Sequence, residues 1–454
     1  PSPHTPGTAF IVYDNHRRSD MKPYVYRADN YGSRFTSLVT SDIDGYALSI
    51  QQDPVDPNLL FLGTEFGLFV STDGGRNWMK WTAGVPTVSV MDLAIQPREN
   101  DLVLGTHGRA VFVIDDYSGL RGLTEADFNS RLKLLSMTNG ISYNVQQSPS
   151  LRFDGATGYR GPNQPRGVLI TFIASGNDLP HPDADKEKAR KKTLRENPPA
   201  EDAKKVEAKV TVEVRNSEGE LVRTFKRDVH QGINRIVWGM EMDGVKQFPG
   251  GQPNDDGTRF GGPEVVPGTY EISLKFDDQE ATGTVTVSQD PRTSYSAEEV
   301  RANTDAALEV VAMTDLAAEA LTRLSDVKKD IEALKAIAEK AQEDESEAEG
   351  DETADEGGEA EKTPLETFIE DADNALKRIG EIQEHFNGPE NPKGFIDTSQ
   401  QITNYIGTAG FYAGSTWDAP SGTTRGAIEV AKTRLDEGIA DVNAFLAGDV
   451  ENLR

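Results

Sequence analysis

Carboxylate, imidazole and guanidinium side chains recur in three short polar segments that interrupt apolar runs near the N-terminus. The segments are YDNHRRSD (13–20), TEFG (64–67) and THGRA (106–110). A carboxylate beside a histidine can transfer a proton, and an arginine binds carboxylates or sugar hydroxyls through its N–H donors. The segments therefore indicate either a ligand-binding site or a rim of solvated ion pairs, and both interpretations stay open. The candidate ligand-binding residues are His107, Arg109, His16 and Arg17.

Catalysis by these segments would need a specific pair of acids. Glycoside hydrolysis by the usual route uses two carboxyl groups that are roughly 5 to 9.5 Å apart. The candidate carboxylates are Glu65, Asp14 and Asp42, whose separations do not follow from the sequence. The sequence thus offers candidates for catalysis but identifies no catalytic set.

The apolar runs around the polar segments belong to a repeat of about 43 residues. ADNYGSRF (28–35) aligns with STDGGRNW (71–78), and NLLFLGTEFGLFVSTD is echoed about 42 residues later by NDLVLGTHGRAVFVIDD. GTAFIVYD near the start is a third copy of the same strand. Each unit contains four apolar runs, and four-strand units at this period predict the blades of a β-propeller.

The aligned octapeptides predict a tight turn between two strands of each unit. An Asp or Asn at the third position can bond the turn backbone, a Gly at the fifth supplies an unusual dihedral, and the aromatic at the eighth is expected to pack into the blade. The turn residues are Ser71, Asp73, Gly75 and Trp78 in one copy, and Asn30, Gly32 and Phe35 in the other.

The pattern Ser71-x-Asp73-x-Gly75-x-x-Trp78 resembles the Asp-box, or BNR repeat, of sialidases, xyloglucan hydrolases and sortilin-type propellers. The surrounding residues resemble the large bacterial sortilin-like proteins that are often labelled glycosyl hydrolases. The other copy departs from the pattern, with Ala28 and Asn30 in place of Ser and Asp. The resemblance implies a propeller, then a β-sandwich and a helical tail, with the Asp-box as a structural turn far from the ligand face.

Loops alternate between the two ends of a four-stranded blade. The three polar segments are therefore expected at one end, joined by Asp42 and Asp44 from a loop between blades, and the Asp-boxes at the other. His107 and Arg109 are the strongest candidates, because THGR separates two apolar strands and the turn requires neither side chain. A sialidase site would need three clustered arginines and a tyrosine nucleophile, and the available arginines, Arg17, Arg18 and Arg109, lack a spacing that identifies one.

The propeller predicted from the repeat is incomplete. SPHTPGTAFIVYD aligns with QDPVDPNLLFLGT, which places the first residues inside a blade, and only about two and a half blades fit before Asp116. Propellers need at least four blades to close. We therefore expect the remaining blades on an N-terminal portion that is cleaved yet bound, or on a separate chain. Without them, two apolar blade faces would be exposed.

Composition shifts divide the rest of the chain. Period-two strands predict an antiparallel sandwich with Trp238 and Tyr270 in its core, and capping patterns at Ser296 and Thr363 predict helices of a bundle. The strand segments VEVRNSEGELVRTF, GINRIVW and PGTYEISLKF resemble the immunoglobulin-like module of secreted bacterial proteins, which implies an immunoglobulin-like sandwich. The predicted domains are terminal propeller blades (1–125), a linker (126–166), the sandwich (167–290) with a charged insertion (177–208), and the helical bundle (296–454) with an acidic disordered linker (343–362).

Composition also bounds the function. The net charge of −28 argues against nucleic acid as a partner, and no apolar run approaches the roughly 20 residues of a membrane span. The absence of cysteine excludes disulfides and suits a periplasmic or extracellular protein, and no pattern indicates a metal site or cofactor. The sequence favours a binding or scaffold protein for a peptide, protein or glycan. The alternatives are a glycoside hydrolase acting on a polysaccharide, and a structural subunit of a surface assembly.

Overall fold

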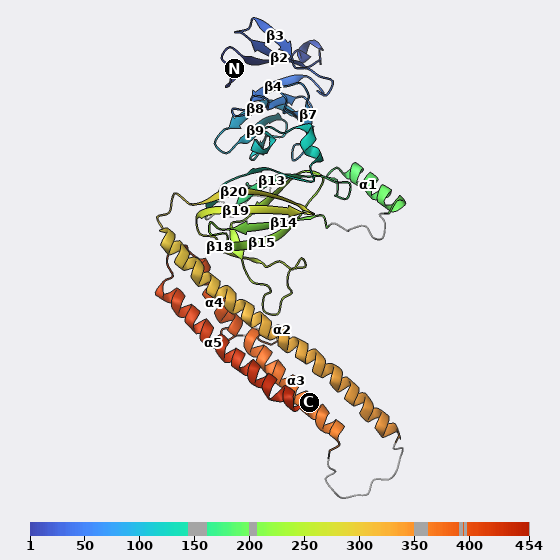
Figure 1. The fold of residues 1–454 in the computed structure, drawn as a ribbon, viewed down its shortest axis with the longest axis vertical. Coiled ribbons are helices and arrows are strands. Elements are labelled where there is room, and N and C mark those ends of the chain that lie inside the picture. Colours follow the sequence, from blue (N-terminus) through green and yellow to red (C-terminus); the bar gives the residue numbers. More distant parts are fainter. Residues whose placement is uncertain (144–160, 199–206, 349–361, 390–393, 395–396, 454) are drawn as a thin grey trace. The chain divides into compact units, whose positions relative to one another are not determined.

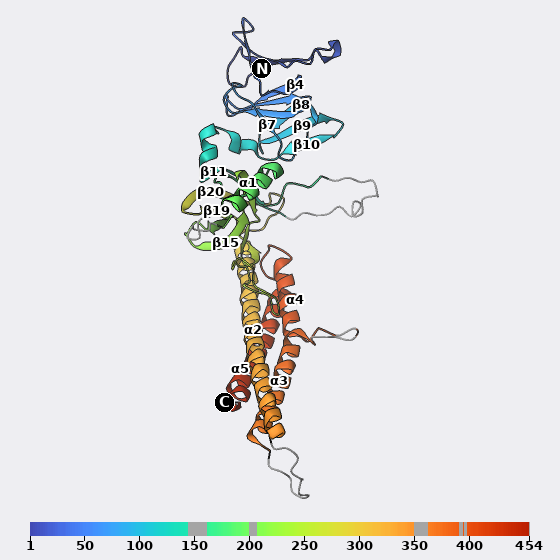
Figure 2. The same ribbon diagram turned by 90° about the vertical axis from the view of Figure 1, so that its right-hand side faces the viewer.

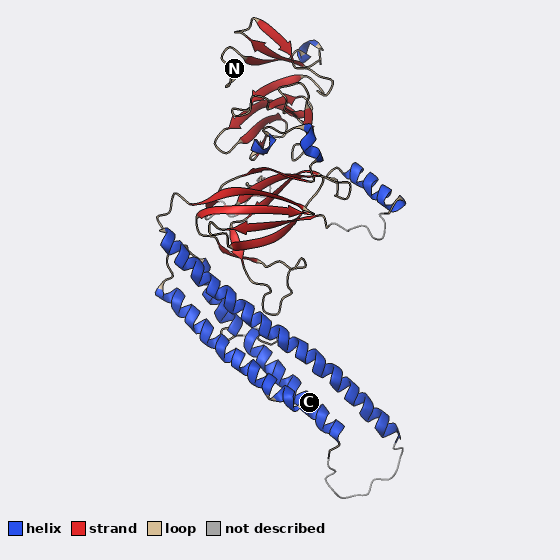
Figure 3. Ribbon diagram, viewed as in Figure 1, coloured by secondary structure: helices blue, strands red, loops and turns tan. Residues whose placement is uncertain are grey.

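A computed structural model describes the chain except residues 144–160, 199–206, 349–361, 390–393, 395–396 and 454. The fold is mixed, with antiparallel β-sheets followed by a C-terminal helical region (Figures 1 and 3). The chain divides into two compact units. One comprises Pro1–Val212, Arg227–Gly239 and Thr269–Thr286, and the other comprises Glu213–Lys226, Met240–Gly268 and Val287–Arg454. Within the described ranges, no helix is both long and apolar enough to cross a membrane.

Three successive antiparallel sheets occupy the N-terminal part of the first unit. The first sheet is β1 (Ala9–Tyr13), β2 (Tyr24–Asp29) and β3 (Arg34–Ser37), with β1 at its edge. The second is β4 (Ala47–Gln52), β5 (Leu60–Thr64), β6 (Gly67–Ser71) and β7 (Met79–Trp81). The third is β8 (Ser89–Gln96), β9 (Asp101–His107) and β10 (Val111–Ile114). Figure 2 shows β4 beside the third sheet, where β4 and β8 are in contact.

Strand register confirms that the sheets repeat one another. Gly63 pairs with Leu68 in the second sheet, and Gly105 pairs with Val111 at the equivalent place in the third. Both sheets also have a bulge at the same position, between Ala47 and Ser49 and between Val90 and Asp92.

The first sheet follows the same plan with a different offset from the predicted one. In the second sheet Leu68 pairs with Gly63, and the 43-residue repeat matches Leu68 to Val25 of the first sheet. Val25 pairs with Val12, so Val12 occupies the position that corresponds to Gly63. The sequence alignment placed Tyr13 there, and it was wrong by one residue. The reason is that both registers match apolar residues to apolar residues, and only cross-strand pairing separates them.

Side-chain alternation gives each sheet two faces, because successive residues of a strand point to opposite sides. We call the side of a sheet that faces the sheet before it in the chain the leading face, and the side that faces the sheet after it the trailing face. In the first sheet, the leading face is the side turned away from the second sheet. In the second sheet Leu60, Leu62 and Phe69 form the leading face and pack with Val25 of the first sheet. Its trailing-face residues, which include Phe61, pack against the third sheet. Both faces of the second sheet are therefore core.

The remaining β-strands form two larger sheets and a small ribbon. One sheet has the order β11 (Leu132–Met137), β13 (Val168–Ala174), β16 (Gly232–Trp238), and the ribbon pairs β17 (Glu241–Asp243) with β18 (Gly261–Glu264). The other sheet has the order β12 (Gly140–Ser142), β20 (Gln279–Gln289), β19 (Gly268–Phe276), β14 (Lys209–Arg215), β15 (Leu221–Asp228). Trp238 and Tyr270 are buried and pack edge to face with their ring centroids 5.4 Å apart, as expected of core aromatics.

One expectation for this region differs from the structure. Residues 126–166 were expected to be a linker, but they contain the short helix η3 (Glu125–Asn129) and the paired strands β11 and β12. Those strands were missed because their apolar residues lack a clear period and pair only with distant strands. The charged insertion contains the exposed helix α1 (Ala184–Glu196), which is capped by Asp183.

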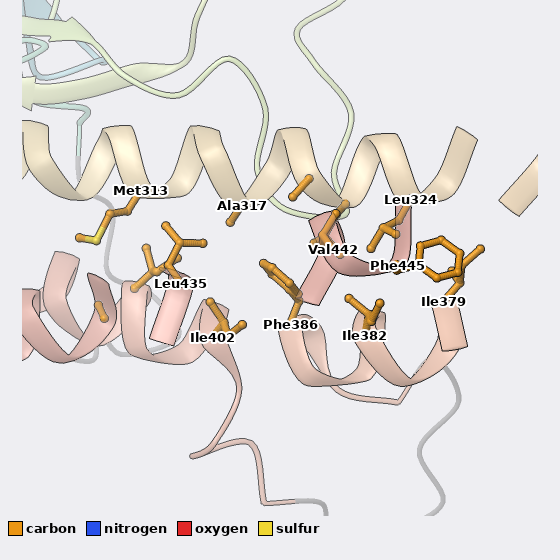
Figure 4. Close-up of a cluster of buried hydrophobic side chains, with 14 of the residues drawn as sticks. Met313, Ala317, Leu324, Ile379, Ile382, Phe386, Ile402, Leu435, Val442 and Phe445 are labelled. Atoms are coloured by element: carbon orange, nitrogen blue, oxygen red, sulfur yellow. The ribbon is translucent and has the colours of Figure 1, made fainter. Parts of the chain in front are cut away.

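Helices form the C-terminal region and share one apolar core, part of which is drawn in Figure 4. They are α2 (Ala297–Ala348), α3 (Pro364–Asn387), α4 (Ile402–Gly414), α5 (Gly422–Ala447) and α6 (Asp449–Asn452). Both predicted capping boxes form, at Ser296 with Glu299 and at Thr363 with Glu366. Helix α2 continues to Ala348, so the start of the expected acidic linker is helical, and most of that linker lies outside the described residues.

Candidate functional site

Loops from two adjacent sheets bring four polar side chains together, and we call them the rim cluster: Asp14, His16, Tyr46 and Glu65. The Asp14 carboxylate accepts hydrogen bonds from the backbone N–H of His16 at 3.0 Å and from its ring Nδ1 at 2.6 Å. The His16 ring stacks on Tyr46 with centroids 4.6 Å apart. Burial is the main cause that raises the pKa of Tyr46, and the nearby charges of Glu65 and Asp14 raise it further.

Local chain geometry holds the rim cluster in place. The backbone N–H of Glu65 donates to the carbonyl of Tyr46 at 3.1 Å, which joins the β5–β6 hairpin to the start of β4. Gly45 is in the left-handed region at φ +79°, and a Cβ there would lie 2.8 Å from the Phe66 ring. Glycine at this position therefore allows the close approach that sets Tyr46 beside Glu65.

The third predicted segment lies at the same end of the sheets. A Cβ on Gly63 of β5 would lie 2.6 Å from the carbonyl oxygen of Val90, and Val90 pairs with Thr106 of β9. Because Gly63 and Thr106 both adjoin Val90 just before their hairpins turn, these two hairpins project in the same direction. His107, the last residue of β9, and Arg109, in the β9–β10 turn, are both exposed, and the positive φ angles of the turn fall on Gly108 and Ala110.

Other candidates of the sequence have local partners or exposed positions. Asp42 is exposed and accepts a hydrogen bond from Thr40 Oγ1 at 2.9 Å, so its recorded contact is within its own turn. Arg17 and Arg18 belong to the short helix η1 (His16–Arg18) and are exposed. Sequence reasoning missed Tyr46, for which the available signal was an aromatic residue directly before a predicted strand and between two polar segments.

The turn from Ser71 to Trp78, which resembles the Asp-box, lies at the other end of the second sheet, after β6. Asp73 Oδ1 accepts from Ser71 Oγ at 2.8 Å and from the backbone N–H groups of Arg76 and Asn77 at 2.9 and 3.0 Å. Burial raises the pKa of Asp73, but these hydrogen bonds outweigh it and the pKa lies below its usual value. Gly75 supplies a φ of +89°. The Asp73 carboxylate therefore accepts its hydrogen bonds from residues of its own turn, which indicates a structural role.

The aromatic residues of the two aligned octapeptides have different surroundings. Trp78 is 4% exposed, and its indole N–H donates to the carbonyl of Leu38 at 2.9 Å. Phe35, at the equivalent position of the first sheet, is 56% exposed. The expectation that Phe35 packs into the blade as Trp78 does is wrong. The physical reason is that this aromatic contacts the preceding sheet, and the first sheet's leading face is exposed.

A hollow of about 490 Å³ lies on that exposed face of the first sheet. Aromatic residues dominate its lining, which consists of Tyr13, Asp14, Asn15, Tyr24, Tyr26 and Phe35. The hydroxyl of Tyr24 donates to Asp20 at 2.8 Å, so the polar tip of one lining ring is paired. The hollow adjoins the rim cluster through Asp14.

A buried ionic network closes the end of the sheets opposite the rim cluster. Asp53 is fully buried and accepts from Arg121 Nε and Nη2, both at 2.9 Å, and from the hydroxyl of Tyr117 at 2.6 Å. Burial raises the pKa of Asp53, but the bonds from Arg121 and Tyr117 outweigh it and lower the pKa. The network joins the β4–β5 loop to the helix η2 (Tyr117–Leu120), and its saturation indicates a structural role.

Comparison with known proteins adds little. No protein-family profile matches the chain, and no curated protein matches it. The chain is similar to a solved structure, the Niastella koreensis GH74 enzyme, at 22% sequence identity with a TM-score of 0.23. The match covers 25% of this chain and 20% of that enzyme, so the chain spans about a fifth of the structure that it matches. A likeness at this level carries no argument about fold or function.

Proposed function

We propose that the three N-terminal sheets are consecutive blades of a β-propeller, and that the protein is an exported binding and scaffold protein that recognises a glycan at the rim cluster. The observation that carries the proposal is the convergence of Asp14, His16, Tyr46 and Glu65 from three separate loops at one end of the sheets. Binding sites of propellers commonly lie where such loops meet, since the rigid sheets hold them in fixed positions. His107 and Arg109 would extend the same site.

The chemistry of Asp14 suits the binding of hydroxyl groups and does not suit the role of general acid. Burial raises the pKa of Asp14, but hydrogen bonds from the backbone and ring of His16 outweigh it and lower the pKa. A glycosidase needs a general acid whose pKa is raised, so Asp14 is poorly suited to act as the general acid. An ionised carboxylate is instead a strong acceptor for sugar hydroxyls, and an aromatic ring beside it suits the apolar face of a sugar.

Replacing His16 by Ala should weaken glycan binding about tenfold, because the substitution removes the ring that orients Asp14 and covers Tyr46. Affinity electrophoresis in gels containing a soluble β-glucan or a galactomannan measures this. His107→Ala, in the neighbouring hairpin, should weaken binding with no change in melting temperature, because its side chain is exposed.

The matched control is Arg98→Ala, an exposed substitution in the loop between β8 and β9. Retardation of the wild type in either polysaccharide, lost in His16→Ala and kept in Arg98→Ala, supports the proposal. Equal mobility of all variants in every polysaccharide contradicts it. Release of new reducing ends by the wild type, abolished by Glu65→Gln, would favour the glycoside hydrolase alternative.

The scaffold part of the proposal concerns the remaining domains. We propose that the five-stranded and three-stranded sheets that follow the propeller blades form an immunoglobulin-like sandwich, and that the sandwich and the helical region serve as interaction arms. A periplasmic or extracellular location suits a chain of 454 residues without cysteine. Blue native electrophoresis of the protein from its source would distinguish a free binding protein from a subunit of a surface assembly.

A further inference from the structure

The charged helix α1 gathers basic side chains on one face, although acidic and basic residues are mixed in its sequence. We call these side chains the basic stripe: Lys188, Lys191, Lys192 and Arg195. Because a helical turn takes 3.6 residues, the stripe lies within an arc of about 100° and extends over about 10 Å of the helix. All four residues are exposed. The stripe is therefore a line of positive charge on a chain whose net charge is −28.

A different side of α1 fixes how the helix is turned. Glu187 accepts hydrogen bonds from Arg190 Nε at 2.7 Å and from the backbone N–H of His181 at 2.8 Å. Arg190 also donates to the backbone carbonyl of Asp178 at 3.3 Å. The side chains of Glu187 and Arg190 are only 16% and 19% exposed. This side holds the helix to the segment before it, so the basic stripe faces solvent.

The segment before α1 is itself anchored beside the strands of its unit. Leu179 is 1% exposed, and the backbone N–H of Gln231 donates to the carbonyl of Pro180 at 2.8 Å. The Asp178 carboxylate accepts from Arg131 Nη1 and Nη2 at 2.8 and 2.7 Å. No residue of α1, which the structure describes throughout, is buried. The chain thus fixes in place a helix that adds nothing to a core, as expected of a part that presents side chains to a ligand.

The chemistry of the basic stripe favours one class of anionic polymer. A helix that lies in a membrane interface needs an apolar face, and the stripe contains no apolar residue. Proteins that bind single-stranded nucleic acid stack bases on aromatic rings, and α1 has no aromatic residue along its described length. A second copy of this chain would bring its own net charge of −28 close to an equal charge. A linear polysaccharide with spaced carboxylates has none of these obstacles.

We propose that the basic stripe binds a linear acidic polysaccharide through the carboxylates of its uronic acid residues. In the free protein Lys191 and Lys192 form exposed ion pairs with Glu187 at 3.4 Å and with Glu196 at 3.7 Å. Exposed ion pairs of this kind are weak, so the carboxylates of a ligand can replace them. The site is separate from the rim cluster and does not rest on the glycan binding proposed there.

Biolayer interferometry on immobilised polygalacturonate tests the proposal with the full chain. The wild type should bind, and added salt should weaken binding because it screens exposed charges. A variant that combines Lys188→Gln, Lys191→Gln, Lys192→Gln and Arg195→Gln should bind at least about tenfold more weakly, since it loses four ion pairs and keeps good helix formers.

The matched control makes the same change at four exposed lysines of the helical region. It combines Lys329→Gln, Lys340→Gln, Lys377→Gln and Lys432→Gln. Both variants lose four positive charges, so a difference between them reports the position of the charges and not their sum. The control should bind polygalacturonate as the wild type does, and circular dichroism should show both variants folded.

Separate probes distinguish this proposal from that for the rim cluster. The stripe variant should be retarded by a neutral β-glucan to the same extent as the wild type, and His16→Ala should bind polygalacturonate as the wild type does. A wild type that does not bind polygalacturonate at low salt, or equal losses in the stripe and control variants, overturns the proposal. Tighter binding of the wild type to single-stranded DNA or to phosphatidylglycerol vesicles, lost in the stripe variant, overturns it in favour of that ligand.

Discussion

Replacing Asp53 by Ala should lower the free energy of unfolding of the N-terminal sheets by about 3–5 kcal/mol, the cost of removing one partner from a buried ion pair. The substitution leaves Arg121 largely buried, with 19% of its side chain exposed, and removes the acceptor of the Tyr117 hydroxyl. Trp78 and Trp81, two of the four tryptophans, lie in or beside β7 of the second sheet, so the unfolding of these sheets contributes to the change in tryptophan fluorescence during urea unfolding.

The pH dependence of the same variant gives an independent check. The pKa of Asp53 is lowered from its ordinary value of 3.8 in the folded state. Its contribution to stability is therefore complete above that value and is lost as the pH falls through the lower folded pKa. The Asp53→Ala variant should lack this part of the acid-dependent loss. A variant with wild-type stability at neutral pH would show that the network does not hold the β4–β5 loop.

Replacing Trp78 by Ala should lower the free energy of unfolding by about 3–5 kcal/mol, as is usual for deletion of a large buried aromatic side chain. Trp78 fills the junction between the first and second sheets, and its N–H satisfies the carbonyl of Leu38. The loss should be visible as a lower urea midpoint, followed by circular dichroism.

The repeat provides its own control for Trp78. Phe35 has the equivalent position in the first sheet but is 56% exposed, so Phe35→Ala should change the free energy of unfolding by no more than about 1 kcal/mol in the monomer. Equal losses for the two substitutions would mean that Phe35 is buried in solution. In that case the leading face of the first sheet would be covered within the monomer.

Much of the fold was predictable because its signals are local. The turn residues Ser71 to Trp78 and the capping boxes at Ser296 and Thr363 each depend on residues within one hairpin or one helical turn. The repeat of about 43 residues is a match between such short segments. Such signals survive in a single sequence, since the backbone requirement and the residue that meets it lie close together.

The features that were missed depend on contacts between distant residues. The one-residue error in the register of β1 arose because only pairing with Val25 distinguishes Val12 from Tyr13 at the Gly63 position. The strands β11 and β12 have partners far along the chain, in β13 and β20. The sequence likewise gave no sign that Tyr46 stacks on His16, because the two residues are 30 positions apart and lie in different loops.

The candidate site was predicted in outline. Repeat logic grouped the segments of Asp14, His16 and Glu65 at one end of the sheets, and the structure brings these three residues around Tyr46. His107 remains a candidate at that end. Asp42 was grouped with them only through its place in a loop between sheets, and its recorded contact is local.

Distances between spin labels test most directly the claim that the N-terminal sheets repeat and so gather their polar loops at one end. The chain has no cysteine, so labels attach only at Cys introduced at the exposed or half-exposed positions Phe66, Arg76 and Arg109. The account predicts that the Phe66–Arg109 label distance is clearly shorter than the Arg76–Arg109 distance, because the five-residue strand β6, roughly 15 Å long, places Arg76 at the other end of the sheet. Equal distances, or a longer Phe66–Arg109 distance, would contradict it.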